Sequence, residues 1–277
     1  MKRETSLLTR VLLYSVLLVF TFMTLYPIFW LTMSSFKTTQ EFQMNRLGLP
    51  RRWTIRNYPQ AWSIGGFSQL FMNSIIYTVT STSAVVLLSL SAGFAFAKIR
   101  SRATPFLHGS FVIGILLSLE AILIPLFLMS NAAGLTDRRL GIILPYIGMG
   151  MPKGVYLCTE YIKSIPDSLV ESARLDGASY PRILASIIMP MAKPVATTLA
   201  ILSVTGVWNE FMLVNILASK GSLKSLPVGI LKFSGALASD YGKQFAALVI
   251  GMLPMLIFYA IFRNQITKGV SAGAVKG

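Results

Sequence analysis

The sequence predicts an all-α membrane protein with six transmembrane helices, and three observations support this. Hydrophobic residues make up 54% of the 277 residues and charged residues only 13%, and the mean hydropathy is +0.65. Soluble domains carry roughly 25% charged residues, so this chain lacks the charge to cover a water-facing surface. Its apolar residues gather into runs of about 20, the length that crosses the hydrocarbon core as a helix.

The expected helices follow one another with polar connections between them. In order they are Val11–Met33, Leu70–Ala97, Pro105–Met129, Leu140–Cys158, Val195–Leu217 and Gln244–Phe262. The first is longer than the core of a signal peptide and no small-x-small cleavage site follows it, so an uncleaved helix is predicted. Six crossings place both termini on one side of the membrane, within a single domain spanning 1–277.

The net charge of +15 comes from Lys and Arg residues that lie mainly between the apolar runs. There they can contact lipid headgroups and influence topology. No basic stripe interleaves with aromatic residues, so nucleic-acid binding is not predicted. The connections expected in the cytoplasm hold a slight excess of Lys and Arg, which favours cytoplasmic termini only weakly. Cys158 is the single cysteine, and no Cys/His cluster suggests a metal site.

The cytoplasmic segment 160–194 is too polar to cross the membrane and predicts two short helices. Ser164 can cap the first helix, Pro166 suits its first turn, and Asp167 completes a capping-box spacing. Asp176-Gly177 ends the first helix, because glycine accepts the left-handed conformation of a C-cap.

The first of these helices places Ile165, Leu169 and Ala173 on one stripe. The small residues Ala173, Gly177 and Ala178 keep the turn slender, so it could enter a groove on a partner protein. An amphipathic helix lying on the membrane surface fits the same pattern. The residues by themselves do not choose between these interpretations.

The same segment resembles the EAA motif of bacterial ABC-importer permeases. The residues that carry the resemblance are Glu171, Ser172, Ala173, Asp176, Gly177, Ala178, Ile183, Ile187, Pro190 and Pro194. Ser172 stands where that motif usually has Ala, and Leu184 where Phe is common. The resemblance implies coupling helices that sit in a cleft of the ATPase subunit, with Glu171 as the expected docking contact.

Further motifs resemble the second permease of carbohydrate importers of the maltose type. They are Asn73-Ser74, Ala92–Ala97, Trp208–Phe211, Leu226–Gly229 and Gly273–Gly277. The resemblance implies the type I ABC importer permease fold, a multi-pass inner-membrane location and cytoplasmic termini. It also implies a sister permease in a heterodimer, an ATPase dimer that the C-terminal tail contacts, an extracytoplasmic solute-binding protein, and a small polar solute, most simply a carbohydrate.

No phosphate-binding loop is present, since Gly242-Lys243 is followed by Gln and the glycine spacing is wrong. No constellation of Ser, His and Asp, and no carboxylate pair, suggests catalysis. The chain is therefore predicted not to be an enzyme and to bind no cofactor itself. ATP and Mg are expected on the partner ATPase.

Three polar residues inside the predicted helices are candidates for the solute path, namely Glu120, Asn209 and Glu210. Intramembrane ionisable residues are costly and usually face a cavity or a partner. Asn209 and Glu210 lie beside Trp208 and Phe211, and amides, carboxylates and aromatic faces bind hydroxyl-rich solutes. For Glu120 a hydrogen bond within the bundle is favoured, and for Glu210 and Asn209 helix packing or a gate contact is the competing role. Lys153 is assigned no role.

Two other classes of function are also considered for a chain of this composition, a secondary transporter and a structural membrane protein. An ion-coupled secondary transporter would need carboxylates or broken helices at related positions in two halves, and no inverted repeat is visible. That class would also leave Glu171–Pro194 without an assigned role. A purely structural or assembly membrane protein is the third class, and its deletion would impair the uptake of no solute. Within the importers, oligosaccharides, monosaccharides and glycerol phosphates all remain open as solutes.

Overall fold

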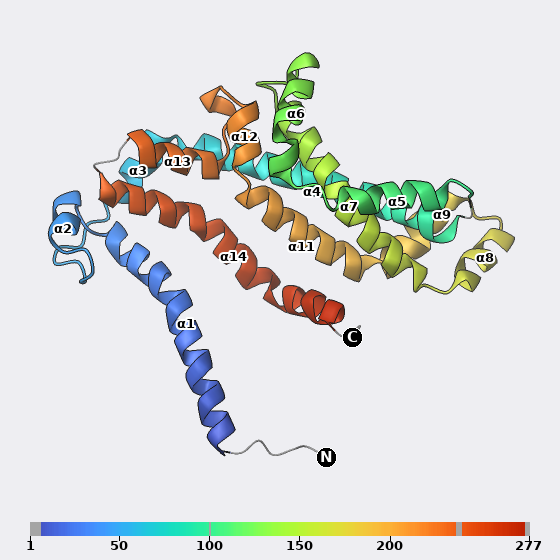
Figure 1. Ribbon diagram of the computed structural model, residues 1–277, viewed down its shortest axis with the longest axis horizontal. Helices are drawn as coiled ribbons and strands as arrows, with labels where there is room; N and C mark the ends of the chain where they lie inside the picture. The colour runs from blue at the N-terminus through green and yellow to red at the C-terminus, as the bar shows by residue number, and fades with distance from the viewer. Residues whose placement is uncertain (1–6, 100, 237–239, 275–277) are drawn as a thin grey trace. The chain divides into compact units, whose positions relative to one another are not determined.

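The computed structural model describes the backbone of residues 7–99, 101–236 and 240–274, and the side chains of residues 7–99, 101–231 and 240–265. Helices are the regular elements of these residues (Figure 1), which confirms the all-α prediction. The chain divides into two compact units. Unit 1 comprises residues 1–67 and 229–254, and unit 2 comprises residues 68–228 and 255–277. The side chains of the C-terminal tail, Gly273–Gly277, lie outside the described part.

Four helices are long and apolar enough to span a membrane without interruption. They are α1 (Leu7–Ser35), α4 (Phe67–Lys98), α7 (Arg139–Lys163) and the 241–265 portion of α14 (Tyr241–Ala274). They correspond to the first, second, fourth and sixth predicted helices. Each begins a few residues earlier or ends a few residues later than its apolar run, because polar residues at the membrane interface continue the helix.

The third and fifth predicted helices are not continuous. The third is a pair, α5 (Thr104–Gly114) and α6 (Leu119–Ala132), bent by 106°. Ser118 causes the restart, because its side chain accepts a hydrogen bond from the Ala121 N–H and caps α6.

The fifth is α11 (Lys193–Asn209) followed by α12 (Met212–Leu217), with extended backbone at Glu210 between them. At its other end α11 meets the preceding helical segment Tyr180–Met191 at 78°. Hydropathy did not reveal the break between α5 and α6, because the residues around it are mainly apolar, and the two polar residues Asn209 and Glu210 were not enough to divide the fifth apolar run.

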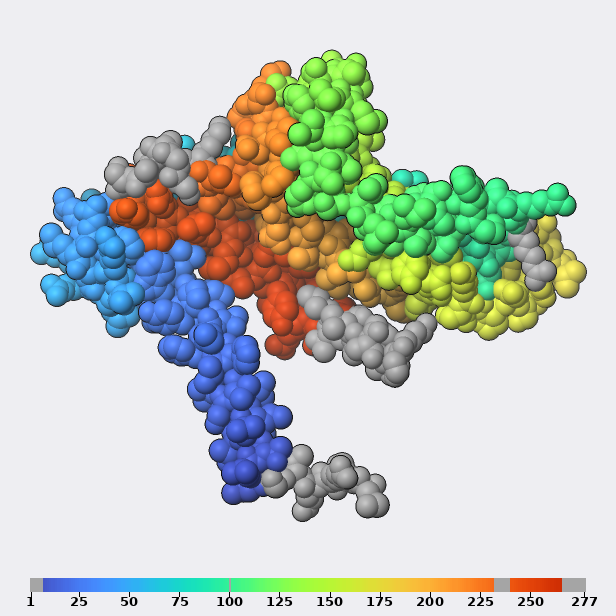
Figure 2. Space-filling view, viewed as in Figure 1, coloured from blue at the N-terminus to red at the C-terminus, as the bar shows by residue number. Residues whose placement is uncertain are grey.

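Unit 1 contains α1, α2 (Thr39–Met44), α3 (Asn57–Gly65), and the 229–254 parts of α13 (Leu226–Ala236) and α14. Residues 7–27 of α1 are all exposed within the chain, and α1 extends without cover from the rest of unit 1 (Figure 2). Such an apolar surface requires lipid or another membrane protein around it. The packed end of α1 holds an aromatic cluster in which the rings of Trp30, Phe42 and Phe245 lie 4.7–5.9 Å apart.

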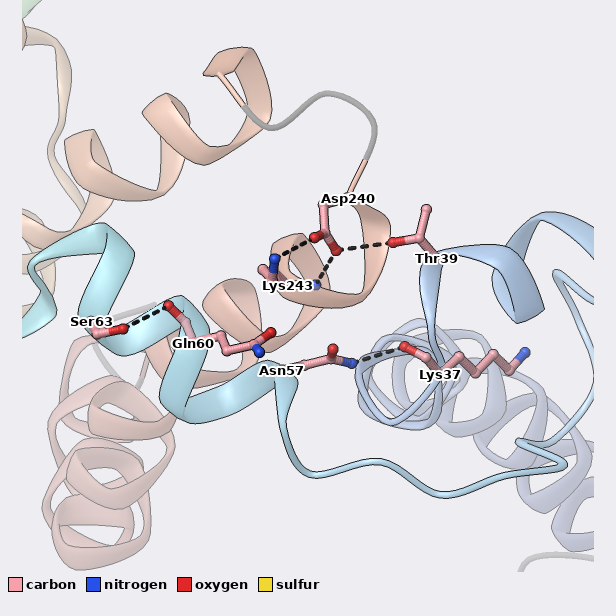
Figure 3. Close-up of polar contacts among 7 residues, drawn as sticks. All are labelled: Lys37, Thr39, Asn57, Gln60, Ser63, Asp240 and Lys243. Atoms are coloured by element: carbon pink, nitrogen blue, oxygen red, sulfur yellow. Dashed lines mark hydrogen bonds and ion pairs between the residues drawn. The ribbon is translucent and has the colours of Figure 1, made fainter.

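Polar contacts close the connection between α1 and α3 within unit 1 (Figure 3). The Asn57 amide donates to the carbonyls of Ser35 (2.7 Å) and Lys37 (2.8 Å). Asp240 accepts a hydrogen bond from Thr39 (2.9 Å) and forms an ion pair with Lys243 (2.6 Å). The two Asn57 bonds satisfy backbone carbonyls at and just beyond the C-terminal end of α1.

Unit 2 is built around α4 and α7, and α7 also contacts α5, α6, α11 and α12. Small residues bring α4 and α7 together: a Cβ added at Gly154 would lie 2.2 Å from Ser89 Oγ, and one at Gly93 would lie 2.7 Å from Cys158 Cβ. Close backbone approach through small residues is how membrane helices gain packing energy. Beyond α7 the chain forms α8 (Asp167–Leu175), α9 (Tyr180–Ile183), a π-helix (Leu184–Ile188), α10 (Met189–Met191), and, after α12, a 3₁₀ turn (Gly221–Leu223).

Candidate functional site

The helix α8 lies near one end of unit 2 (Figure 1), and its residues are buried on one face and exposed on the other. Val170 is buried and Ala173 packs against the same hydrophobic cluster. Glu171, Ser172 and Asp176 are exposed, and Leu175 is 88% exposed. A helix held by small and apolar residues thus exposes two carboxylates and a leucine in the segment that we call the α8 tip (residues 171–178).

Two predictions about the start of this helix are wrong. Ser164 does not cap α8. It follows the end of α7, and its hydroxyl donates to the Tyr161 carbonyl at 2.7 Å. Asp167 does not form a capping box, because Ser164, its expected partner, lies at the end of α7 and Pro166 occupies the N-cap of α8. One carboxylate oxygen of Asp167 pairs with Lys98 Nζ at 2.5 Å.

The predicted stripe Ile165, Leu169 and Ala173 is also only partly right. Ile165 is buried and Ala173 half-buried, whereas Leu169 is 39% exposed and Val170 takes its place in the core. Ile165 precedes the helix, so the angular spacing that was counted from it does not apply.

The turn after α8 is a Schellman motif, as the Asp176-Gly177 pair predicts. Gly177 has φ +79°, its N–H donates to the Arg174 carbonyl (3.0 Å), and the Ala178 N–H donates to the Ala173 carbonyl (2.9 Å). The Arg174 guanidinium closes the turn from outside. It donates to the Ala178 carbonyl at 3.2 Å and lies 4.6 Å from the ring of Tyr180. Contacts within this chain therefore hold the backbone of the α8 tip in this conformation without a partner protein.

The chain after the turn changes from α-helix to π-helix ahead of Pro190. Proline has no N–H to donate to the carbonyl of the residue four positions earlier, and the wider turns over Leu184–Ile188 accommodate this. Pro190 itself is exposed. It marks the bend into α11 and lies apart in sequence from the α8 tip.

The predicted outer connections meet at the other end of α4. The Asn73 amide donates to the carbonyls of Ser222 (2.8 Å) and Lys224 (3.0 Å), and Ser74 accepts from the Leu226 N–H (2.9 Å). Two motifs far apart in sequence, Asn73-Ser74 and the start of Leu226–Gly229, are thus direct partners.

A cavity of about 230 Å³ opens between α4, α7 and α11 in unit 2. Its polar lining residues are Ser81, Thr82, Tyr146, Lys153, Ser203 and Glu210. The hydroxyls of Ser81 and Thr82 are buried without a hydrogen-bond partner among the described residues. Most of the remaining lining is apolar, so these six residues supply nearly all of the hydrogen-bonding side chains in the cavity.

Glu210 belongs to this lining and also forms hydrogen bonds at the break between α11 and α12. One of its carboxylate oxygens accepts from the Tyr146 hydroxyl (2.7 Å), and the other accepts from the Leu213 N–H (2.9 Å). The second bond satisfies an N–H in the first turn of α12. The carboxylate therefore stabilises the broken helix as well as facing the cavity.

Comparison with known proteins shows the family of this chain. Residues 63–271 match the binding-protein-dependent transport system inner membrane component family. The chain belongs to this family. It is a permease subunit of an ABC importer.

Relatives of this permease cover nearly its full length. A multiple sugar-binding transport system permease of Streptococcus mutans is 34% identical over 91% of this chain and 92% of that protein. A putative ABC transporter permease of a Caldicellulosiruptor species is 32% identical over 91% of both chains. A chain in the crystal structure of a bacterial ABC transporter that imports the acidic polysaccharide alginate matches with a TM-score of 0.84 and 25% identity, over 95% of this chain and 99% of that one.

The predicted solute-path residues of the permease are not brought together. Of the three, only Glu210 lines the cavity. The Asn209 amide donates to the Thr205 carbonyl of its own helix at 3.0 Å, and Glu120 is exposed in the first turn of α6. Sequence reasoning missed Lys98 and Tyr146, which contact Asp167 and Glu210. Lys98 carries a signal, since it is the first charge after a long charge-free helix, whereas Tyr146 is one aromatic residue in an apolar run.

Proposed function

We propose that this permease forms half of the translocation pathway for a carbohydrate or related hydroxylated solute. The names of its relatives support this class of solute: they include sugar, trehalose, diacetylchitobiose and sulfoquinovosyl glycerol transport permeases. In this proposal a sister permease supplies the other half and an extracytoplasmic binding protein delivers the solute. The termini are cytoplasmic, and the chain binds no cofactor. ATP and Mg belong to a dimer of separate ATPase subunits.

The observation that carries the proposal is the exposed, preformed α8 tip. Docking a rigid element costs less ordering entropy than docking a mobile loop. The exposed carboxylate of Glu171 suits a basic residue of the partner, and Leu175 suits an apolar pocket. ATP binding would move the ATPase subunits, and the docked tip would pass that movement to the helix bundle. The ATP-bound ATPase dimer would then bind the inward-open and outward-open states of the permease with different affinities, which shifts their populations.

The test is co-purification of the ATPase with the tagged permease from a gentle detergent. We expect the wild-type chain to retain a second permease and two ATPase copies. Glu171→Gln should weaken ATPase retention by roughly tenfold, because an interfacial charge pair loses one partner. Glu160→Gln is the matched control, since Glu160 is also exposed but pairs with Lys163 of its own helix at 2.7 Å.

Equal retention by Glu171→Gln and the control would refute the docking role of the tip. A wild-type chain that purifies alone and moves solute without ATP would refute the proposed function itself. The secondary-transporter alternative gains no support from the two bent helix pairs. One pair forms the third predicted span and the other joins segment 160–194 to the fifth, and these are not equivalent positions in two halves.

A further inference from the structure

We propose that Lys98 is a positioning residue that ties the start of the coupling element to α4, so that movement of α8 reaches the cavity through this helix. The inference rests on the proposed function, because it concerns how the docked tip transmits movement. Nothing in the sequence motifs assigns Lys98 a role. It follows from the contacts of one buried ammonium group.

The Lys98 side chain is only 3% exposed, and its ammonium reaches across to the segment that opens α8. Nζ donates to the Ile165 carbonyl at 2.5 Å and to Asp167 Oδ1 at 2.5 Å. A buried ammonium without partners is strongly unfavourable, because its desolvation is not compensated. Because both acceptors lie within residues 165–167, α8 cannot separate from the end of α4 without exposing or orphaning this charge.

An ordinary helix-terminal lysine does not account for this geometry. A lysine near a helix C-terminus usually interacts with the carbonyls of its own last turn and remains solvated. Here the bonds go to a different element, 67 residues later in the chain. The Lys98 side chain is the buried member of this pair, whereas the Asp167 side chain is 65% exposed.

A second contact joins α4 to the far side of the coupling turn. The Phe94 ring lies 6.3 Å from that of Tyr180, edge to face, and Tyr180 is the residue over which Arg174 is stacked. Phe94 also shares a hydrophobic cluster with Ile165, Val170 and Ile183. The end of α4 is therefore attached before and after α8, by an ion pair and by apolar packing.

The other part of α4 lines the cavity. Ser81, Thr82 and Val85 belong to its lining, and Lys98 follows Thr82 by 16 positions, which is about 24 Å of continuous helix. The tight packing of α4 on α7 at Gly93 and Gly154 keeps this part from deforming independently. The structure thus connects the tip to the cavity through one stiff element.

The experiment uses the assembled transporter in lipid vesicles, with Cys158 replaced by Ala and a reporter Ser203→Cys in the cavity lining. A maleimide labels the reporter with and without a non-hydrolysable ATP analogue. We expect the nucleotide to change the labelling rate about tenfold in the parent transporter, within the usual range of coupling between two sites. Lys98→Met should reduce this change to less than about twofold while the ATPase remains bound.

Three further variants separate positioning from folding. Lys98→Arg keeps the charge and donors and should restore most of the response. Lys163→Met, which removes an exposed lysine paired within its own helix, should behave as the parent. If the Lys98→Met transporter does not assemble, Asp167→Asn tests the inference in its place. It weakens the same contact at a side chain that is 65% exposed, and we expect it to lower the response to nucleotide.

A full nucleotide response in Lys98→Met, or in Asp167→Asn where the first does not assemble, would overturn the inference. A parent transporter that retains no ATPase, or whose cavity never responds to nucleotide, would instead refute the proposed function. The two failures are therefore distinguishable.

Discussion

Asp137 organises the connection between α6 and α7 with a single carboxylate. It accepts hydrogen bonds from the consecutive N–H groups of Ser219 (2.7 Å) and Lys220 (3.0 Å). Its own N–H donates to the Leu217 carbonyl, and it has a positive φ of 55°, which Asp tolerates better than most residues. The Lys220 N–H is the largest influence that lowers the pKa of Asp137, assisted by the Ser219 N–H and the charges of Lys220 and Lys224.

The Asp137 carboxylate should make the stability of the permease depend on pH. A folded-state pKa below the unfolded value of about 3.9 means that the stabilisation is present at neutral pH and is lost as the pH falls through the folded pKa. Asp137→Asn keeps the positive φ but removes the charge. We expect its melting temperature in detergent to lie below that of the wild type at neutral pH, and the gap to shrink below about pH 4. A gap that stays constant or widens in acid would contradict this.

The pairing of α4 with α7 is the element-scale feature that the sequence did not reveal. Glycines in apolar runs are compatible with bends, packing or neither. The structure distinguishes them: an added Cβ at Gly154 would lie 2.2 Å from Ser89 Oγ and 3.0 Å from Ser89 Cβ, whereas one at Gly148, on the same helix, would meet nothing within 4 Å. Only the three-dimensional partner decides which glycine is required.

These two glycines provide a matched pair of substitutions. Gly154→Ala should lower the free energy of unfolding by about 1–3 kcal/mol through overpacking. Gly148→Ala should be neutral or stabilising by up to about 1 kcal/mol, because alanine is the better helix former. Unfolding of both variants by a denaturing detergent measures the difference. Equal effects would show that α4 and α7 do not approach as closely as described.

At the scale of the whole molecule, contacts within each unit join segments that the six-crossing topology places on the same side. Lys98 and Asp167 are both predicted inside, Asp137 and Ser219 both outside. In unit 1, Thr39 and Asp240 are both predicted outside. An odd number of crossings between the two members of any of these pairs would place them on opposite sides of the membrane, so the contacts agree with the alternation predicted between residues 39 and 240.

Cysteine labelling tests this topology. In a Cys158→Ala background, cysteines at Ser179 and Lys220, both exposed, should react from opposite faces of the membrane. We expect a membrane-impermeant maleimide to label position 220 in intact spheroplasts and position 179 only after the membrane is opened. Labelling of both positions before opening, or of position 179 alone, would refute the assigned orientation.

The sequence by itself determined the membrane environment, four of the six spans within a few residues, and the Schellman turn at Gly177. These follow from short-range physics: apolar runs need lipid, and a left-handed backbone position needs glycine. The EAA resemblance, also carried by contiguous residues, is the source of the proposed coupling role of segment 160–194. Tertiary structure decided the rest. It broke the third and fifth spans, moved Asp167 from a cap to an ion pair with Lys98, separated Glu120 and Asn209 from the cavity, and placed Tyr146 on Glu210. The partners of Asp167 and Glu210 lie in distant segments of the chain, and a linear pattern does not show which distant group lies within hydrogen-bonding reach.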